Sequence, residues 1–218
     1  MSYIITSQDE LFKTVAPNLP AAGEQYTRLY QEQLNNVLRL YFNRIDKLMG
    51  QLNASSNTAG LNAPYGAFSS SATQTATANT ATLMTLNTTD FSNAVSLASS
   101  KITVTNAGIY NLQFSVQFQN TDNQIQDISI WLRQNGTDIP GSTGLVSIPA
   151  RKSASAGDEA HEIIGWNYYL SMTAGQYVEI YWSTTLASVT IKAYPASTGP
   201  TRPSTQSVVA TMSFVSAL

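Results

Sequence analysis

The sequence has 218 residues, of which 43% are hydrophobic and only 11% are charged, and its formal net charge is −2. Ordinary globular domains carry about 25% charged residues, whereas here 25 Ser and 25 Thr supply much of the polar surface. So few cations argue against sequence-independent nucleic-acid binding, which depends on Lys and Arg contacts to phosphate. With no cysteine and one histidine, disulfides, thiolate metal sites and a two-histidine metal site within one chain are excluded.

Residues 1–23 are predicted to form an extended attachment arm. Pro17 and Pro20 interrupt any helix there, so at most one helical turn is expected, near residues 9–15. The first residues show no basic start followed by an apolar run, and no segment reaches the ~18 apolar residues of a membrane span. We therefore expect a soluble protein that is made in a host cytoplasm and is not inserted in a membrane.

Residues 24–52 are predicted to form one long amphipathic helix, because apolar side chains recur there at steps of three and four. We call this set the helical stripe: Tyr30, Leu34, Leu38, Tyr41, Ile45, Leu48 and Leu52. Near-heptad spacing is typical of a bundle or coiled coil between copies of a chain, so the helical stripe is predicted to be an oligomer interface. Two alternatives remain at this point: packing against the chain's own β domain, and docking onto another protein.

Residues 53–64 are rich in Ser, Asn, Thr and Ala and are predicted to be a flexible linker. From Tyr65 to the C-terminus the apolar period is two. The strongest strand signal is at 108–119, where Tyr110, Leu112 and Phe114 alternate with polar residues. Further strands are expected at 128–133, 144–148, 162–172, 177–182, 189–193 and 208–215. Residues 65–218 are therefore predicted to be a mainly β head, an antiparallel jelly-roll β-sandwich of about eight to ten strands.

Short motifs in the head carry a family resemblance. The head begins with a short aromatic strand at 65–68, and its strongest strand begins with Gly108-Ile109-Tyr110. A late alternating strand follows Ala174-Gly175-Gln176, and the last strand contains Phe214. In these features the head resembles the globular-head jelly roll of the complement-type and tumour-necrosis-factor-like families, although Gln176 replaces the usual acid. The resemblance implies a homotrimer that assembles through flat, aromatic-rich faces.

The layout of the whole chain, with arm, helix, Ser/Thr/Asn-rich spacer and β tip, resembles virion fibre or appendage proteins of tailed bacteriophages. This resemblance implies a structural, non-enzymatic protein of the virion, such as a head, neck or tail fibre or a capsid decoration protein. Residues 1–52 would contact other virion proteins (capsid, portal or neck, or tail), and the β head would point outward. The alternative is a receptor-binding tip for host attachment, whose loops at 120–126, 149–158 and 195–205 recognise a host surface glycan.

Catalytic chemistry is not indicated by the sequence. His161 lies among acids, and a solvated acidic loop running into a strand is the favoured interpretation, with pH sensing or a calcium site using Asp158, Glu159 and Glu162 as alternatives. No nucleophile, base and acid set and no phosphate-binding loop is apparent. We therefore expect no cofactor, no metal and no enzymatic activity; a polysaccharide depolymerase is the disfavoured third possibility.

Aromatic side chains are the remaining candidates in the head. Those predicted to lie in an oligomer interface or in the core are Tyr110, Phe114, Trp131, Trp166, Tyr168, Tyr181 and Phe214. Alternation places Trp166 and Tyr168 on one face of their strand and Tyr169 on the other. Because both faces are then apolar, one is expected to pack inside the sandwich and the other against another surface, with glycan contact as the alternative role for these rings.

Overall fold

The computed structural model describes residues 17–21, 27–155 without 55–62, and 157–218, and for 48–54 it describes the backbone alone. Most of the predicted arm and linker therefore lie outside the described residues. The chain separates into a helical unit and a β unit that begins at Pro64. We describe each unit by itself.

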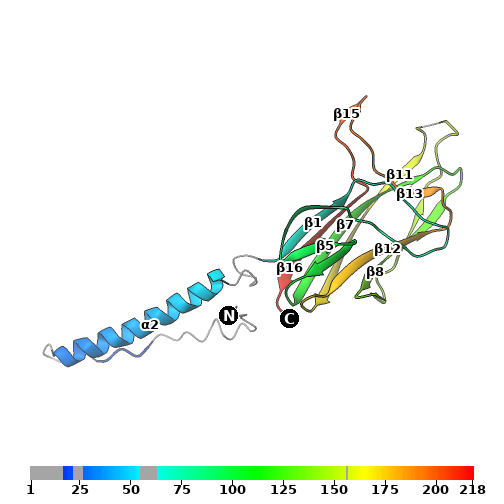
Figure 1. The fold of residues 1–218 in the computed structure, drawn as a ribbon. Helices are drawn as coiled ribbons and strands as arrows, with labels where there is room; N and C mark the ends of the chain where they lie inside the picture. The colour runs from blue at the N-terminus through cyan, green and yellow to red at the C-terminus, as the bar shows by residue number, and fades with distance from the viewer. Residues whose placement is uncertain (1–16, 22–26, 55–62, 156) are drawn as a thin grey trace. The chain divides into compact units, whose positions relative to one another are not determined.

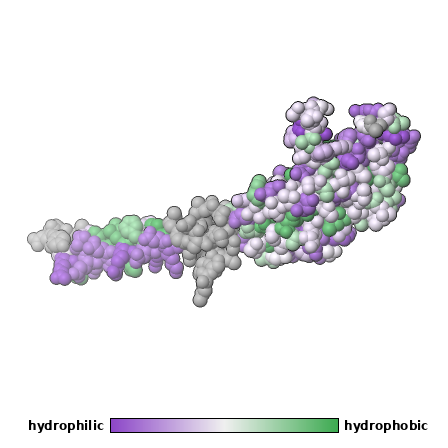
Figure 2. All heavy atoms as spheres, turned by 45° about the horizontal axis from the view of Figure 1, so that its top comes forward, coloured by the Kyte–Doolittle hydropathy of each residue, from purple (hydrophilic) through white to green (hydrophobic). Residues whose placement is uncertain are grey.

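The helical unit contains α2 (Arg28–Ala54). Its N-cap is Thr27, whose Oγ1 accepts a hydrogen bond from the backbone N–H of Tyr30 at 3.3 Å. The described helix begins directly after this cap, and residues 24–26 of the predicted helix lie outside the described residues. The helix also continues two residues past the predicted end. Figure 2 shows hydrophilic and hydrophobic side chains of α2 gathered on different sides.

The β unit consists of two antiparallel sheets (Figure 1). Sheet A contains β1 (Tyr65–Ser70), β2 (Gln74–Thr75), β4 (Thr88–Asn93), β7 (Gly108–Asn120), β11 (Ala160–Met172), β13 (Val189–Ile191) and β16 (Val208–Ser216). Sheet B contains β3 (Thr82–Leu83), β5 (Val95–Ala98), β6 (Lys101–Val104), β8 (Gln126–Gln134), β9 (Thr137–Asp138), β10 (Gly144–Ile148) and β12 (Tyr177–Thr184). A small hairpin, β14 (Ser197–Thr198) with β15 (Thr201–Arg202), stands out from the body of the sandwich.

The order of the long strands is that of a jelly roll. Sheet A runs β1-β16-β7-β11 and sheet B runs β6-β12-β8-β10, so the chain passes repeatedly from one sheet to the other. The predicted fold class, a mainly β antiparallel sandwich preceded by a single helix, is confirmed. The β11 strand is an edge of sheet A, since β7 is its one ladder partner among the described strands.

The core lies between the sheets and follows the alternation of the strands. In β7, the residues predicted to share a face are all buried, from Tyr110 to Phe118. They meet the inward side chains of sheet B, among them Trp182, whose ring lies 5.7 Å from that of Phe118. Hydrophobic burial on this scale stabilises the sandwich because each fully buried large side chain contributes roughly 1.5–3 kcal/mol.

Several strands were not expected from the sequence. Strands β4, β5 and β6 lie in a stretch rich in Ser and Thr, whose weak hydrophobic alternation hides them. In the Ser/Thr/Ala-rich stretch at 69–80, the strand residues after Ser70 are the two of β2. The turn at Asn135-Gly136 is a two-residue hairpin loop with positive φ at both residues, 49° and 81°.

Gly144 lies under the ring of Trp166, which reaches across from β11 to β10. A Cβ on Gly144 would lie 1.7 Å from the indole Cη2 of Trp166. We expect Gly144→Ala to destabilise the head by about 1–3 kcal/mol, because the indole must leave its site against the core. Urea unfolding measures the difference. The matched control is Gly165→Ala, where a Cβ meets nothing within 4 Å; equal midpoints for the two variants would contradict this packing.

Tyr110 makes the stability of the head depend on pH in the alkaline range. Its hydroxyl donates a hydrogen bond to the carbonyl oxygen of Asn106 at 2.9 Å, and burial raises the pKa of Tyr110 to about 12. Because the charged form is disfavoured in the fold, this contribution is present below pH 10 and is lost as the pH rises through about 12. We expect the urea midpoint of Tyr110→Phe to fall less between pH 9 and pH 12 than the midpoint of the parent protein does. Parallel profiles would exclude this role.

Candidate assembly surface

The outer face of sheet A carries apolar side chains that one chain leaves in solvent. On the long strands Ile163 and Tyr169 of β11 are 68% and 60% exposed, and Val209 and Val215 of β16 are 39% and 50% exposed. At the end where the chain enters the sheet, the exposed rings of Tyr65 and Phe91 contact each other edge to face at 6.1 Å. Exposed apolar side chains gathered on one face are typical of an interaction surface.

This face is also uncharged. None of the outward positions of β1, β16, β7 and β11 holds Asp, Glu, Lys or Arg; besides the apolar residues they hold hydroxyl and amide side chains and, at one end, His161. Asp90 of the edge strand β4 lies at the margin, where one carboxylate oxygen is 3.2 Å from Ser69 Oγ. Arg202 of the β14–β15 hairpin lies over part of this face, but the strands themselves would present no like charge to a second copy.

A shallow groove crosses the middle of this face. Strands β16, β7 and β11 meet in one row of paired residues formed by Val209, Ser115 and Gly165. Because Ser115 and Gly165 have small side chains, the surface is lower along this row. Two adjoining hollows of about 420 Å³ each follow this row. One is walled by Gln113, Asn167 and Thr211, and the other runs under the hairpin residues 202–206. The groove can receive a protruding side chain.

The outer face of sheet B is different in kind. It carries Lys101, Arg133 and Glu179 together with the rings of Trp131 and Tyr181. Lys101 Nζ lies 4.3 Å from the centre of the Tyr177 ring, a cation–π contact that suits a solvated surface. The two outer faces of the sandwich thus differ in charge, and the uncharged one is the better candidate for contact between copies.

The helical unit presents a second unburied apolar surface. Between residues 28 and 47, where side chains are described, none is buried. Of the helical stripe, Tyr30, Leu34, Leu38, Tyr41 and Ile45 are half-buried, and the side chains of Leu48 and Leu52 lie outside the described residues. Ion pairing on this helix is local and exposed: Arg28 Nε lies 2.7 Å from Glu32 Oε1.

The aromatic residues singled out from the sequence fall in three places. Tyr110 and Phe114 are buried in the core, whereas Trp166, Tyr168 and Phe214 are partly buried against it. The prediction that Tyr169 faces away from Trp166 and Tyr168 is confirmed. Trp131 and Tyr181 lie on the outer face of sheet B, stacked on each other at 5.9 Å. The exposed residues Ile163, Val209 and Val215 were missed, although the same alternation of strands 162–172 and 208–215 places them on the outward side.

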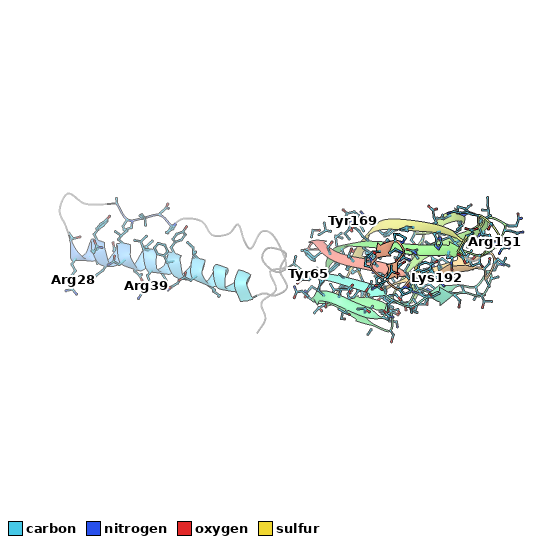
Figure 3. The ribbon with its side chains drawn as sticks, turned by 90° about the horizontal axis from the view of Figure 1, so that it is seen from above. Arg28, Arg39, Tyr65, Arg151, Tyr169 and Lys192 are labelled. Carbon is cyan, nitrogen blue, oxygen red and sulfur yellow. The ribbon has the colours of Figure 1, made fainter. Side chains whose placement is uncertain are left out.

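Two of the three loops proposed for receptor contact, 120–126 and the described part of 149–158, lie at one end of the sandwich, whereas residues 202–205 of the third lie over sheet A beside Ser115 and Ile163. In the antiparallel register, Asn120, Ala160 and Val189 are neighbours at the end opposite to Tyr65, and Figure 3 shows Tyr65 and Arg151 at opposite ends of the head. The buried Asn120 holds two of these loops, since its Nδ2 donates to the carbonyl oxygens of Gln124 and Pro149, both at 2.9 Å.

The segment around His161 is a loop that runs into strand β11, as interpreted from the sequence, and because the strand begins at Ala160 rather than at residue 162, the exposed His161 lies in the strand. Its Nε2 lies 2.5 Å from the hydroxyl oxygen of Tyr194, which also accepts a hydrogen bond from Gln119 Nε2 at 2.8 Å. Among the described residues no group of three His, Asp or Glu side chains is placed to hold a metal ion. In the same part of the chain, no helix is long and apolar enough to cross a membrane.

No protein-family model matches the chain, and a search of curated proteins finds no match. Its function is therefore inferred from its own surfaces.

Proposed function

We propose that this chain is a structural, non-enzymatic component of a tailed-bacteriophage virion, a homotrimeric fibre, appendage or decoration protein. Residues 1–52 attach it to other virion proteins, and the β head points outward. The observation that carries the proposal is the apolar outer face of sheet A, whose strands present no charge, in a chain that also leaves the described part of a near-heptad helical stripe only half-buried.

Self-association is the simplest way to cover both surfaces. Six exposed apolar side chains on sheet A, at roughly 1.5–3 kcal/mol each when buried, would contribute on the order of 10 kcal/mol per chain before ordering and association costs. Those costs are of similar size, so the head and the helix must assemble together. A trimer with threefold symmetry covers the sheet face and the helical stripe together. A head-to-tail contact between heads closes into a ring of three copies, and a heptad pattern allows three helices to pack in one bundle.

The virion part of the proposal has a direct test. Particles from a culture that makes this protein are separated on a density gradient and probed with antibody against residues 65–218. We expect the protein in the particle fraction, and we expect a chain lacking residues 1–20 to remain trimeric but to stay at the top of the gradient. Full-length protein that never enters the particle fraction would refute a virion role, and normal incorporation of the shortened chain would place the anchor elsewhere.

A receptor-binding tip is the second candidate. It is favoured by the position of two of the loops, 120–126 and 149–158, at the end of the sandwich farthest from the chain's entry, where a host surface would be met first. The clamp from Asn120 gives these loops a defined shape in the free chain, which lowers the ordering cost of binding.

A further inference from the structure

The outer face of sheet B holds an ordered stack of rings that the assembly proposed above does not use. Trp131 of β8 and Tyr181 of β12 are directly opposite each other in the sheet, and their rings lie 5.9 Å apart at 29°. The guanidinium carbon of Arg133 lies 4.0 Å from the centre of the Tyr181 ring. Tyr181 therefore contacts the indole as well as the guanidinium, and the three groups form one cluster on a partly exposed surface.

Asp138 fixes this cluster from the neighbouring strand β9. Its Oδ1 accepts hydrogen bonds from Trp131 Nε1 at 2.9 Å and from Arg133 Nε at 2.7 Å. The hydrogen bond from Arg133, together with that from Trp131, holds the pKa of Asp138 below its usual value. The side chain of Asp138 is 56% exposed, and its Oδ2 takes no part in these two bonds. This oxygen can therefore accept a hydrogen bond from the hydroxyl of a ligand.

The charge at this place selects among ligands. Arg133 is balanced by Asp138, and on the same outer face Glu179 is matched by Lys101 of the neighbouring strand β6, so the site has no net charge. An acidic ligand would therefore gain no net attraction. A neutral pyranose offers apolar C–H faces that pack on Trp and Tyr rings and hydroxyls that donate to a carboxylate and accept from a guanidinium.

We propose that Trp131, Tyr181, Arg133 and Asp138 form a binding site for a neutral hexopyranose chain, on the outer face of sheet B and away from the loops at the tip. Its rings are held in place before the ligand arrives, which reduces the entropy cost of stacking. The site goes beyond the proposed function, because it requires neither the trimer nor the virion. It would give each copy of the head a lateral contact to polysaccharide.

The test uses the full chain and a panel of neutral hexaoses: maltohexaose, cellohexaose, laminarihexaose and mannohexaose. Tryptophan emission and titration calorimetry report binding. We expect at least one of them to bind and to shift the emission, Trp131→Ala to weaken that affinity at least tenfold, and Trp131→Phe, which keeps a ring but loses the N–H donor, to weaken it less. A tri-uronate is expected to gain no affinity over the neutral chains.

The matched control is Tyr169→Ala, which removes an exposed ring from sheet A and should leave saccharide affinity unchanged. Circular dichroism of each variant verifies that the head is folded, and sedimentation separates loss of assembly from loss of binding. No binding by any neutral hexaose would overturn the site. So would equal affinity of the Trp131→Ala variant, or preference for the uronate.

Discussion

Replacing Gly165 with arginine is expected to convert the assembled protein to folded monomers. In a single chain a Cβ at this position meets nothing within 4 Å, so the strand accepts the side chain. In the proposed trimer the same side chain would fill the groove beside Ser115 and Val209 and would place a cation where the contacting strands carry no charge. Burying an unpaired charge costs several kcal/mol, which is comparable with the whole net gain from association.

Sedimentation velocity measures the mass of the Gly165→Arg variant, and urea unfolding measures its stability. Two controls match the change. Gly165→Ala adds little volume and should remain assembled, and Leu145→Arg adds the same cation at a 79% exposed position of sheet B and should also remain assembled. A Gly165→Arg protein that is still trimeric would exclude the groove from the interface.

The double substitution of Leu38 and Ile45 by aspartate is expected to weaken the trimer and reduce its helix content, while the β head stays folded. Both side chains belong to the helical stripe, and a carboxylate there must be desolvated in a bundle. In proteins most of a helix's stability comes from packing of its amphipathic face, so the ellipticity at 222 nm should fall together with the association constant.

The control for the helix uses the same kind of residue off the helical stripe. Leu40 is 53% exposed and lies on another side of α2, so Leu40→Asp with Asn43→Asp adds two carboxylates without touching the stripe. This pair should assemble as the parent does. If both double variants behave alike, the helical stripe is not a seam between chains.

Strong alternation made part of the fold predictable. The 13 residues of β7 form a strand with one apolar and one polar face, and that pattern alone predicts that Tyr110 and Phe114 face the core. The same logic separated Trp166 and Tyr168 from Tyr169. Strands β4 to β6 were missed because sheet pairing, rather than their own weak pattern, stabilises them.

The surfaces were less predictable than the core. The groove depends on Gly165, Ser115 and Val209 lying in one row, and that row follows from the register of three strands distant in sequence. The contact between Arg133 and Asp138 has a local signal, because the two-residue turn at Asn135-Gly136 places them opposite each other. Tyr181 has no such signal, since it reaches Trp131 only through the pairing of β12 with β8.

The mass of the full chain in solution tests most directly whether single copies cover one another's apolar surfaces. Sedimentation equilibrium at micromolar concentration should give about three times the 23.6 kDa of one chain. A folded species of 23.6 kDa over the same concentration range would contradict assembly through sheet A and the helical stripe alike.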